Sequence, residues 1–487
     1  MLFLSGGGRR PAAANVPWNA ACRPPCMKRL VLRWLSGAAA GVAATAAMSL
    51  LMLGAKKLGA LGEPPPRRIV RRLLGPRAPR GASLDVAALA AHVAFGAGMG
   101  ALFATLPPRA RSQGGGLLFG AGVWAVNYAG VLPKAGLMPP AGRDRVGRPS
   151  SMIAAHLVYG AALAASHRRL WTEADALRGK VVLVAGGTRG LGRCLARALL
   201  EAGAKVAICG RSPQSLEQTR DFLRPFGAPV LADICDLRQP EQARLFVQRV
   251  ESELGPIHVV IANAATIEVA PIESLTPEDF QSAMKEIFGS AVNVTLAALP
   301  AMQARGEGTV AVISSVGGRL GVPHLAPYSA AKFAQVGFAE ALQAEVSKDG
   351  LRVVTVAPGL MRTGSHLHAT YKGDAERELA WFGASAVAPL LSIDADVAAR
   401  KIVRAIAHGD RFLTFTPAAR VGIWLHDHAP ELWSLLFSTI GRVLPSAPSR
   451  RSPSRSLEGG VIFANSGSWF LDRLRRWTAP LAAAHGQ

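Results

Sequence analysis

Two patterns of hydrophobic residues divide the chain. In the first third, four stretches contain no Asp, Glu, Lys or Arg: 34–55, 86–108, 112–133 and 149–166. From residue 180 onward, short runs rich in Val and Ile alternate with longer segments of helical character. Such alternation predicts a parallel sheet that is covered by helices on both faces.

The predicted elements of this second region follow one another along the chain. The strands are expected at 180–186, 205–210, 256–263, 308–315 and 351–359. The helices are expected at 191–202, 239–254, about 276–304, and 327–347. The sequence therefore predicts an α/β fold with a Rossmann-type, doubly wound parallel sheet, preceded by an all-α helical region.

The four uncharged stretches approach the roughly 20 residues that cross a bilayer as a helix. They contain glycine pairs four residues apart (Gly37/Gly41, Gly96/Gly100 and Gly116/Gly120), a spacing that lets membrane helices approach closely. Basic clusters flank them, so we expect a multi-pass membrane region. The loop 56–83 carries eight basic residues, which favours a re-entrant or interfacial position for one segment. The alternative is a soluble, alanine-rich helical domain.

Charge and cysteine content exclude several classes of protein. The net charge of +23 comes from the flanks, since residues 179–441 hold 25 basic and 25 acidic side chains. A nucleic-acid-binding protein would carry this excess on its recognition domain, so anionic membrane lipid is the better partner. Five cysteines form no CxxC pair, and we expect neither a disulfide framework nor a metal site.

These patterns predict five regions. They are an extension at 1–33, a transmembrane helical region at 34–168, a linker at 169–178, a catalytic domain at 179–445, and a basic, flexible tail at 446–487. Residues 1–26 are either an upstream extension or a secretory signal peptide. The tail ends in WFLDRLRRW, whose aromatic and basic residues suit a membrane interface, with disorder as the alternative.

The first predicted strand runs into the sequence AGGTRGLG, in which Gly186, Gly190 and Gly192 precede a helix. Glycines at such a turn allow the backbone to approach a pyrophosphate, and the helix N-terminus supplies oriented N–H groups. This position between a strand and a helix predicts a dinucleotide-binding loop.

With Tyr328 and Lys332 four residues apart, and Ser315 thirteen residues before the tyrosine, the region 179–410 resembles the short-chain dehydrogenase/reductase family. The resemblance implies the fold expected above and a nicotinamide cofactor. It also implies a cofactor-binding set: Gly186, Thr188, Arg189, Gly190, Leu191, Gly192, Arg211, Asp236, Leu237, Asn263, Ala264, Tyr328, Lys332, Pro358, Gly359 and Thr363. It suggests a homo-oligomer.

The residue types explain the expected reaction. Reduction of a ketone requires a proton for the developing alkoxide, yet tyrosine has a reference pKa near 10. Lys332 lies one helical turn from Tyr328, where its positive charge would lower that pKa. Ser315 would donate a hydrogen bond to the carbonyl oxygen. Tyr328 is thus the predicted acid/base, with Ser315 and Lys332 completing the catalytic set.

The second strand ends in Cys209-Gly210-Arg211, without the acid that usually contacts the adenosine ribose in NAD enzymes. Arg211 and Arg189 would instead pair with the 2′-phosphate of NADP, so we expect NADP rather than NAD. This cofactor pool favours a catalytic domain on the cytoplasmic side.

Two alternatives to this enzyme remain open. Ile287 occupies the position where many family members carry an asparagine, so a catalytically inactive NADP-binding scaffold is the main rival. A transporter with an attached redox sensor is a third interpretation.

The segment after Pro358 mixes apolar and polar side chains (Trp381, Phe382, Leu390, His366, His368 and Tyr371) and predicts an apolar lid for a lipophilic carbonyl or alcohol.

Overall fold

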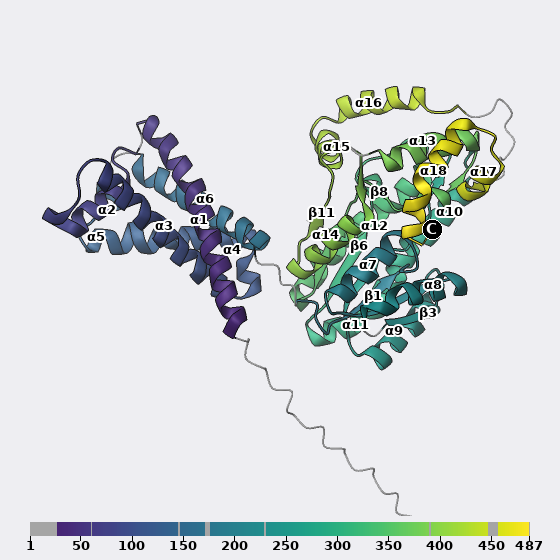
Figure 1. Ribbon diagram of the computed structural model, residues 1–487, viewed down its shortest axis with the longest axis horizontal. Helices are drawn as coiled ribbons and strands as arrows, with labels where there is room; N and C mark the ends of the chain where they lie inside the picture. Colours follow the sequence, from purple (N-terminus) through teal and green to yellow (C-terminus); the bar gives the residue numbers. More distant parts are fainter. Residues whose placement is uncertain are drawn as a thin grey trace, which may run out of the picture. The chain divides into compact units, whose positions relative to one another are not determined.

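The computed structural model describes residues 27–59, 61–144, 147–170, 176–227, 230–388, 391–446 and 456–486. The chain divides into two compact units, Met1–Thr172 and Glu173–Gln487 (Figure 1). Most of the predicted N-terminal extension and the centre of the predicted linker, 171–175, lie outside the described residues.

The first unit consists entirely of helices in its described part. Its helices are α1 (Met27–Lys57), α2 (Pro65–Leu74), α3 (Ala82–Thr105), α4 (Gln113–Trp124), a π-helical segment (Ala125–Val131), α5 (Leu132–Lys134) and α6 (Arg148–Leu170). Helix α1 packs on α3 and α6, and α4 packs on α6. A core of alanines, methionines and aromatic residues lies between them.

The glycine pairs mark the points where these helices cross, as their spacing predicted. A Cβ atom on Gly37 would lie 2.5 Å from the Gly100 carbonyl oxygen, and one on Gly116 would lie 2.6 Å from the Ala164 Cβ atom. Real Cβ atoms do not tolerate such distances, so only glycine permits these backbone approaches.

Three of the four predicted stretches lie in helices that are long and apolar enough to cross a membrane: Val31–Lys57, Ala82–Thr105 and Gln113–Lys134. Helix α6 is not among them, because serines and histidines interrupt its apolar run. Among the described residues, Pro277–Arg305 also meets the criterion. That segment covers the parallel sheet and buries Val294 and Met302 in the core there, so its apolar face has a partner within the unit.

The second unit is built on a seven-stranded sheet in the order β11-β7-β6-β4-β1-β2-β3, in which every pair is parallel. The strands are β1 (Val181–Ala185), β2 (Lys205–Gly210), β3 (Val230–Ile234), β4 (Ile257–Ala262), β6 (Thr309–Ile313), β7 (Arg352–Val356) and β11 (Phe412–Leu413). Connecting helices include α7 (Gly190–Glu201), α8 (Pro213–Leu223), α9 (Pro240–Leu254), α10 (Pro277–Ala283), α11 (Ser290–Arg305), α12 (Ala326–Val346) and α14 (Ala395–His408) (Figure 1). The predicted doubly wound α/β fold is confirmed.

Alternating residues of each strand face opposite sides of the sheet. Val182 and Val184 of β1 belong to the core beneath α7 and α14, whereas Val181 and Leu183 belong to the core beneath α9, α11 and α12. Both faces of the strands are therefore buried, which explains their continuous apolar runs.

The single helix expected at 276–304 has a more complex form. A π-helical segment, Met284–Gly289, separates α10 from α11 and contains the fully buried Ile287. Such segments often occur at functional sites, and this one lies beside the lysine of the predicted catalytic set.

Residues 456–486, expected to belong to a flexible tail, instead form a short strand and two helices. Strand β12 (Leu457–Glu458) pairs with β9 (Thr370–Tyr371), and helices α17 (Gly459–Asn465) and α18 (Trp469–Ala484) follow. Leu471 and Leu474 of α18 are buried in a cluster with α13 (Ala375–Val387). The aromatic and basic residues that suited a membrane interface lie on the outward face of α18, where Trp469 and Trp477 are exposed.

We expect Leu474→Ala to destabilise this unit by about 2 kcal/mol, because it leaves a cavity beside Gly383. Thermal unfolding in detergent would measure the change. Trp477→Ala, on the exposed face of the same helix, should change stability by no more than about 0.5 kcal/mol. Equal effects of the two substitutions would contradict the packing of α18.

Candidate active site

A cavity of about 520 Å³ lies where the glycine loop, the ends of the central strands and the start of α12 meet. Thirteen of the predicted residues line it: Gly186, Thr188, Arg189, Gly190, Leu191, Arg211, Asp236, Leu237, Asn263, Ala264, Tyr328, Lys332 and Thr363. The cavity thus forms at the carboxyl ends of the strands, as expected for ligand sites in open α/β sheets.

Four predicted residues do not line the cavity: Gly192, Ser315, Pro358 and Gly359. Gly192 packs against the glycine loop itself, and Gly359 lies beside Thr416. The Pro358 carbonyl accepts a hydrogen bond from the Val316 N–H at 2.7 Å, and so fixes the backbone that follows Ser315.

The glycine loop has the backbone form that its sequence predicted. Gly186 has φ of +72° and Gly190 of +53°, values that side chains rarely tolerate. A Cβ atom on Gly186 would lie 2.9 Å from the Ala264 Cα atom, and one on Gly192 would lie 2.8 Å from the Asn263 side-chain nitrogen. The Asn263 amide also donates to the Gly186 carbonyl at 3.0 Å. The residues present therefore form a close-fitting turn at the N-terminus of α7, which suits a dinucleotide pyrophosphate.

Tyr328 and Lys332 lie on the first two turns of α12 and both face the cavity. The Lys332 Nζ atom is 5.7 Å from the centre of the Tyr328 ring. The lysine is almost completely buried, with 2% of its surface exposed. Its ammonium donates to the Ile313 carbonyl at 2.8 Å and to the Gln335 Oε1 atom at 3.0 Å.

The electrostatics differ from the expectation that Lys332 lowers the tyrosine pKa. Burial raises the pKa of Tyr328 above its ordinary value, and a hydrogen bond with Ser315 offsets this only in part. Burial lowers the pKa of Lys332 to about 7. Desolvation therefore has the larger effect on the pKa of both groups, while the Lys332 ammonium is hydrogen-bonded to Ile313 and Gln335.

Ser315 follows β6 and caps the short helix Val316–Gly318, where its hydroxyl oxygen accepts a hydrogen bond from the Gly317 N–H at 3.1 Å. Its neighbour Ser314 lines the cavity, and the Ser314 hydroxyl donates to the Lys332 carbonyl at 2.9 Å. Ser315 thus contacts Tyr328, and Ser314 holds the helix that carries Lys332.

Gln335, which was not among the predicted residues, connects Lys332 to the π-helical segment. Its side-chain amide donates to the Ile287 carbonyl at 3.0 Å while its oxygen accepts from Lys332. Gln335 and Ile287 are fully buried. Ile287 therefore joins this hydrogen-bonded chain through its backbone carbonyl. The chain runs from Lys332 through Gln335 to Ile287, the position where many family members carry an asparagine side chain. The signal was the three-residue spacing from Lys332, which places Gln335 on the same helix face.

Charged groups surround the part of the cavity next to β2 and β3. Arg211 lies 3.6 Å from Glu286, and Arg238 lies 2.7 Å from Asp236 and 3.4 Å from Glu286. The hydrogen bond from Arg238 holds the pKa of Asp236 below its ordinary value. With Arg189, three guanidinium groups thus face two carboxylates. Arg238 was not predicted, although it lies only two residues after Asp236.

Most residues of the predicted lid are packed in the interior of the second unit. Tyr371 and Phe382 are buried in the cluster that holds α18, and the Trp381 indole donates to buried Glu378 at 2.6 Å. The structure brings His368 to the cavity, where it lies 2.6 Å from Glu458 of β12. Leu390 lies outside the described residues.

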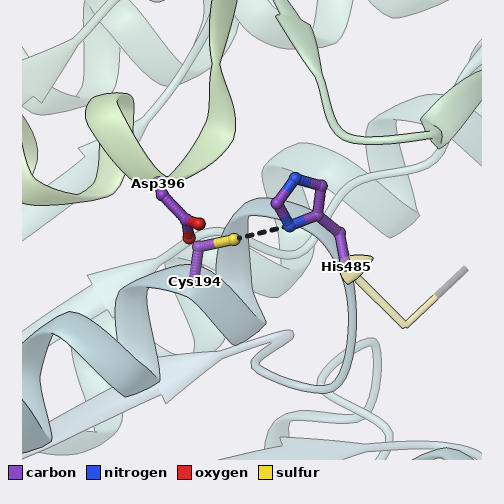
Figure 2. Close-up of side chains that lie close together, drawn as sticks. All are labelled: Cys194, Asp396 and His485. Atoms are coloured by element: carbon purple, nitrogen blue, oxygen red, sulfur yellow. Dashed lines mark hydrogen bonds between the residues drawn. The ribbon is translucent and has the colours of Figure 1, made fainter. Parts of the chain in front are cut away.

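The end of the chain also contacts the glycine loop. The Gly190 N–H donates to the His485 carbonyl at 2.9 Å. The His485 ring and the Asp396 side chain both point toward Cys194 on α7, and the His485 Nδ1 atom lies 3.3 Å from the Cys194 Sγ atom (Figure 2). Burial raises the pKa of the Cys194 thiol, so the thiol is protonated at neutral pH.

These three side chains place possible metal ligands within 4.8 Å of one another. However, Arg197 already pairs with Asp396 at 2.7 Å, and Arg193 lies beside Gly486. A divalent cation would have to displace a thiol proton and approach two guanidinium groups. The cluster therefore serves better as a hydrogen-bonded link between the chain end and α7.

Comparison with known proteins agrees with this geometry. Residues 180–371 match the family model for short chain dehydrogenases, and residues 31–178 match a family of unknown function, DUF6789. The chain is 32% identical to a dehydrogenase/reductase SDR family protein 7-like from Anopheles gambiae over 265 residues, which are 53% of this chain and 81% of that protein. It is 32% identical to a tropinone reductase homolog from Datura stramonium, over 38% of this chain and 70% of that protein.

Among solved structures, an actinorhodin polyketide ketoreductase with NADPH is similar with a TM-score of 0.45 and 28% identity, covering 49% of this chain and 97% of that chain. A metagenomic short-chain oxidoreductase in complex with NADP gives a TM-score of 0.41 and 23% identity, covering 50% and 99%. With the matched relatives, the parallel sheet and the glycine loop, the chain belongs to the short-chain dehydrogenase/reductase family and is an oxidoreductase of carbonyl and alcohol groups.

Proposed function

We propose that the protein is a membrane-anchored, NADP(H)-dependent oxidoreductase that interconverts a carbonyl and an alcohol on an apolar substrate. The observation that carries the proposal is the position of Tyr328 and Lys332 on adjacent turns of α12, facing the cavity that the glycine loop lines.

The roles of the residues follow from their contacts. A bound nicotinamide supplies or accepts the hydride. Tyr328 transfers the proton at its phenol oxygen, since it faces the cavity. Ser315 is hydrogen-bonded to Tyr328 and orients the substrate oxygen beside it. Lys332, held by Ile313 and Gln335, provides the positive charge when it is protonated.

The apolar part of the cavity supports a lipophilic substrate. Beyond the glycine loop the lining includes Ala265, Ile267, Met361 and Ala369. Such side chains select hydrocarbon and leave orientation to the few polar groups near Tyr328.

NADP is favoured by the guanidinium groups beside β2. Arg189 and Arg211 line the cavity, and the end of β2 brings no carboxylate of its own to repel a phosphate. Glu286 lies 3.6 Å from Arg211 and would orient it. The adenosine 2′-phosphate would thus meet two arginines.

We expect Arg211→Ala to raise the KM for NADPH about tenfold or more, because it removes a charge-assisted hydrogen bond, and to leave the KM for NADH nearly unchanged. Steady-state kinetics with each cofactor would measure this. Arg244→Ala removes an exposed arginine paired with Glu241 on α9, so it serves as the control. An equal loss with both cofactors would contradict a phosphate contact.

The membrane anchor rests on α1, α3 and the segment 113–134, with basic residues in α2 and at the end of α6 facing lipid headgroups. A multi-pass arrangement with the catalytic unit on the cytoplasmic side would place the cavity near a membrane-dissolved substrate. Assembly into homo-oligomers is a further part of this proposal.

A reconstituted preparation tests the proposed function. Full-length protein would be incorporated into vesicles, floated on a density gradient, and supplied with NADPH and a panel of apolar ketones. Co-flotation and cofactor oxidation are expected. Tight NADPH binding without turnover across the panel would favour an inactive scaffold, and a chain that stays at the bottom of the gradient would exclude the anchor.

A further inference from the structure

Helix α16 (Pro430–Val443) exposes an apolar face that the other described residues of the second unit do not cover. None of its fourteen residues is buried. Leu432, Leu436 and Ile440 follow one another four residues apart and form one stripe, which Val443 extends. Val443 is 83% exposed and Leu435 is 65% exposed.

The opposite face of α16 is polar, with Glu431, Ser434 and Ser438. This division is typical of a helix that lies between water and an apolar medium. In a soluble protein, a stripe of this kind needs a partner.

The neighbouring helix α15 (Pro417–His428) continues the apolar surface with Val421 and Trp424, which are 62% and 59% exposed. The two helices pack on each other, since the Trp433 ring of α16 meets the His426 ring of α15 at 5.9 Å and lies beside Gly422. They form a stable hairpin, named here the α15–α16 hairpin, rather than two loose segments.

The hairpin is attached to the loop that follows Ser315. Asp427 pairs with Arg319 at 2.9 Å, and Leu320 lies against Gly422. Thr416, which caps α15, lies beside Gly359. The exposed apolar surface is therefore connected through three short contacts to the loop that follows Ser315 and to Gly359.

We propose that the α15–α16 hairpin docks on the surface of an anionic bilayer, with Leu432, Leu436 and Ile440 inserted among the lipid chains. The fourteen residues of α16 span only about 21 Å, shorter than the roughly 20-residue helix that crosses a membrane, so the helix lies in the plane of the interface.

Charge favours lipid over a second copy of the chain. Arg420, near the start of α15, and Arg442, near the end of α16, are both exposed. Arg450, Arg451 and Arg455 follow in the sequence. Anionic headgroups attract these side chains, whereas two identical hairpins facing each other would bring like charges together. Trp424 has the amphipathic ring that prefers the headgroup region.

The inference rests on the membrane anchor proposed above and adds a second contact, made by the catalytic unit itself. Docking would hold the loop that follows Ser315 at the interface, where a bilayer-dissolved ketone is concentrated.

The test uses full-length protein with Cys22 and Cys26 replaced by serine and a single new cysteine on α16, labelled with an environment-sensitive fluorophore. Leu436→Cys places the label on the apolar stripe. Ser438→Cys places it about 200° around the same helix and is the matched control. The parent without a new cysteine measures background labelling of the buried Cys194, Cys209 and Cys235. The samples are nanodiscs of phosphatidylcholine and phosphatidylglycerol that carry one copy each.

We expect a lipid-borne nitroxide to quench the label at 436 several-fold more than the label at 438, and a water-soluble quencher to show the reverse order. Equal access of the water-soluble quencher to both positions would overturn the docking while leaving the anchor intact. If position 436 is shielded from the water-soluble quencher only with two copies per disc, the surface serves self-association, and the proposed docking on lipid is overturned as well. A chain that does not enter nanodiscs would overturn both the docking and the anchor.

Discussion

Tyr328→Phe is expected to lower kcat by about 10²- to 10⁴-fold, the range typical for loss of a positioned acid/base. The substitution removes only the phenol oxygen, and the ring keeps its place beside the Lys332 ammonium. Affinity for NADPH should therefore change little. Stopped-flow measurement of cofactor oxidation, with cofactor binding measured separately by fluorescence, would distinguish the two quantities.

Tyr371→Phe is the matched control, because it removes a phenol oxygen from a buried tyrosine that does not line the cavity. The Tyr371 hydroxyl donates to the His366 carbonyl at 2.9 Å, so its loss should cost about 1 kcal/mol of stability and little activity. If Tyr328→Phe retained full turnover, the proposed proton transfer would be refuted even though the family assignment would stand.

Gln335→Leu is expected to impair both folding and catalysis. It leaves the Ile287 carbonyl without its donor and removes one of the two acceptors of the Lys332 ammonium, which together should cost about 2–6 kcal/mol of stability. A displaced lysine beside Tyr328 should lower kcat by roughly a hundredfold. Thermal unfolding and single-turnover kinetics would measure the two effects.

The pH dependence separates positioning of Lys332 from simple loss of structure. The pKa of Lys332 is lowered to about 7, so the protonated form is lost as the pH rises through that value. Removing the Gln335 oxygen removes a group that stabilises the protonated form, and the alkaline limb of the activity profile should move to lower pH. Gln335→Glu retains the acceptor and adds negative charge, so its limb should move to higher pH. Identical profiles for the two variants would refute the positioning role.

The sequence predicted the features that depend on local pattern. The β-branched runs gave the central strands because both faces of a covered parallel sheet are apolar, as Val181 to Ala185 illustrate. The glycine loop was predictable because its φ values and close approaches exclude other residues. The cavity brings together thirteen of the predicted residues because the carboxyl ends of parallel strands meet at one edge of the sheet.

The features that the sequence did not predict depend on long-range contacts. Gln335 gains its role only because the π-helical segment turns the Ile287 carbonyl toward it. The expected effect of Lys332 on the tyrosine pKa considered only the charge one helical turn away, whereas the fold buries both groups and desolvation has the larger effect on their pKa values. Residues 469–484, which form α18, were assigned to a tail because a Ser/Pro/Arg-rich stretch precedes them, and the buried leucines of this helix gain meaning only from the facing helix α13.

The hydrogen bond from the Gly190 N–H to the His485 carbonyl has a practical consequence for attaching labels to the protein. A bulky group attached beside His485 would lie next to the glycine turn, and immobilising the protein at that point would hinder entry of a dinucleotide into the cavity.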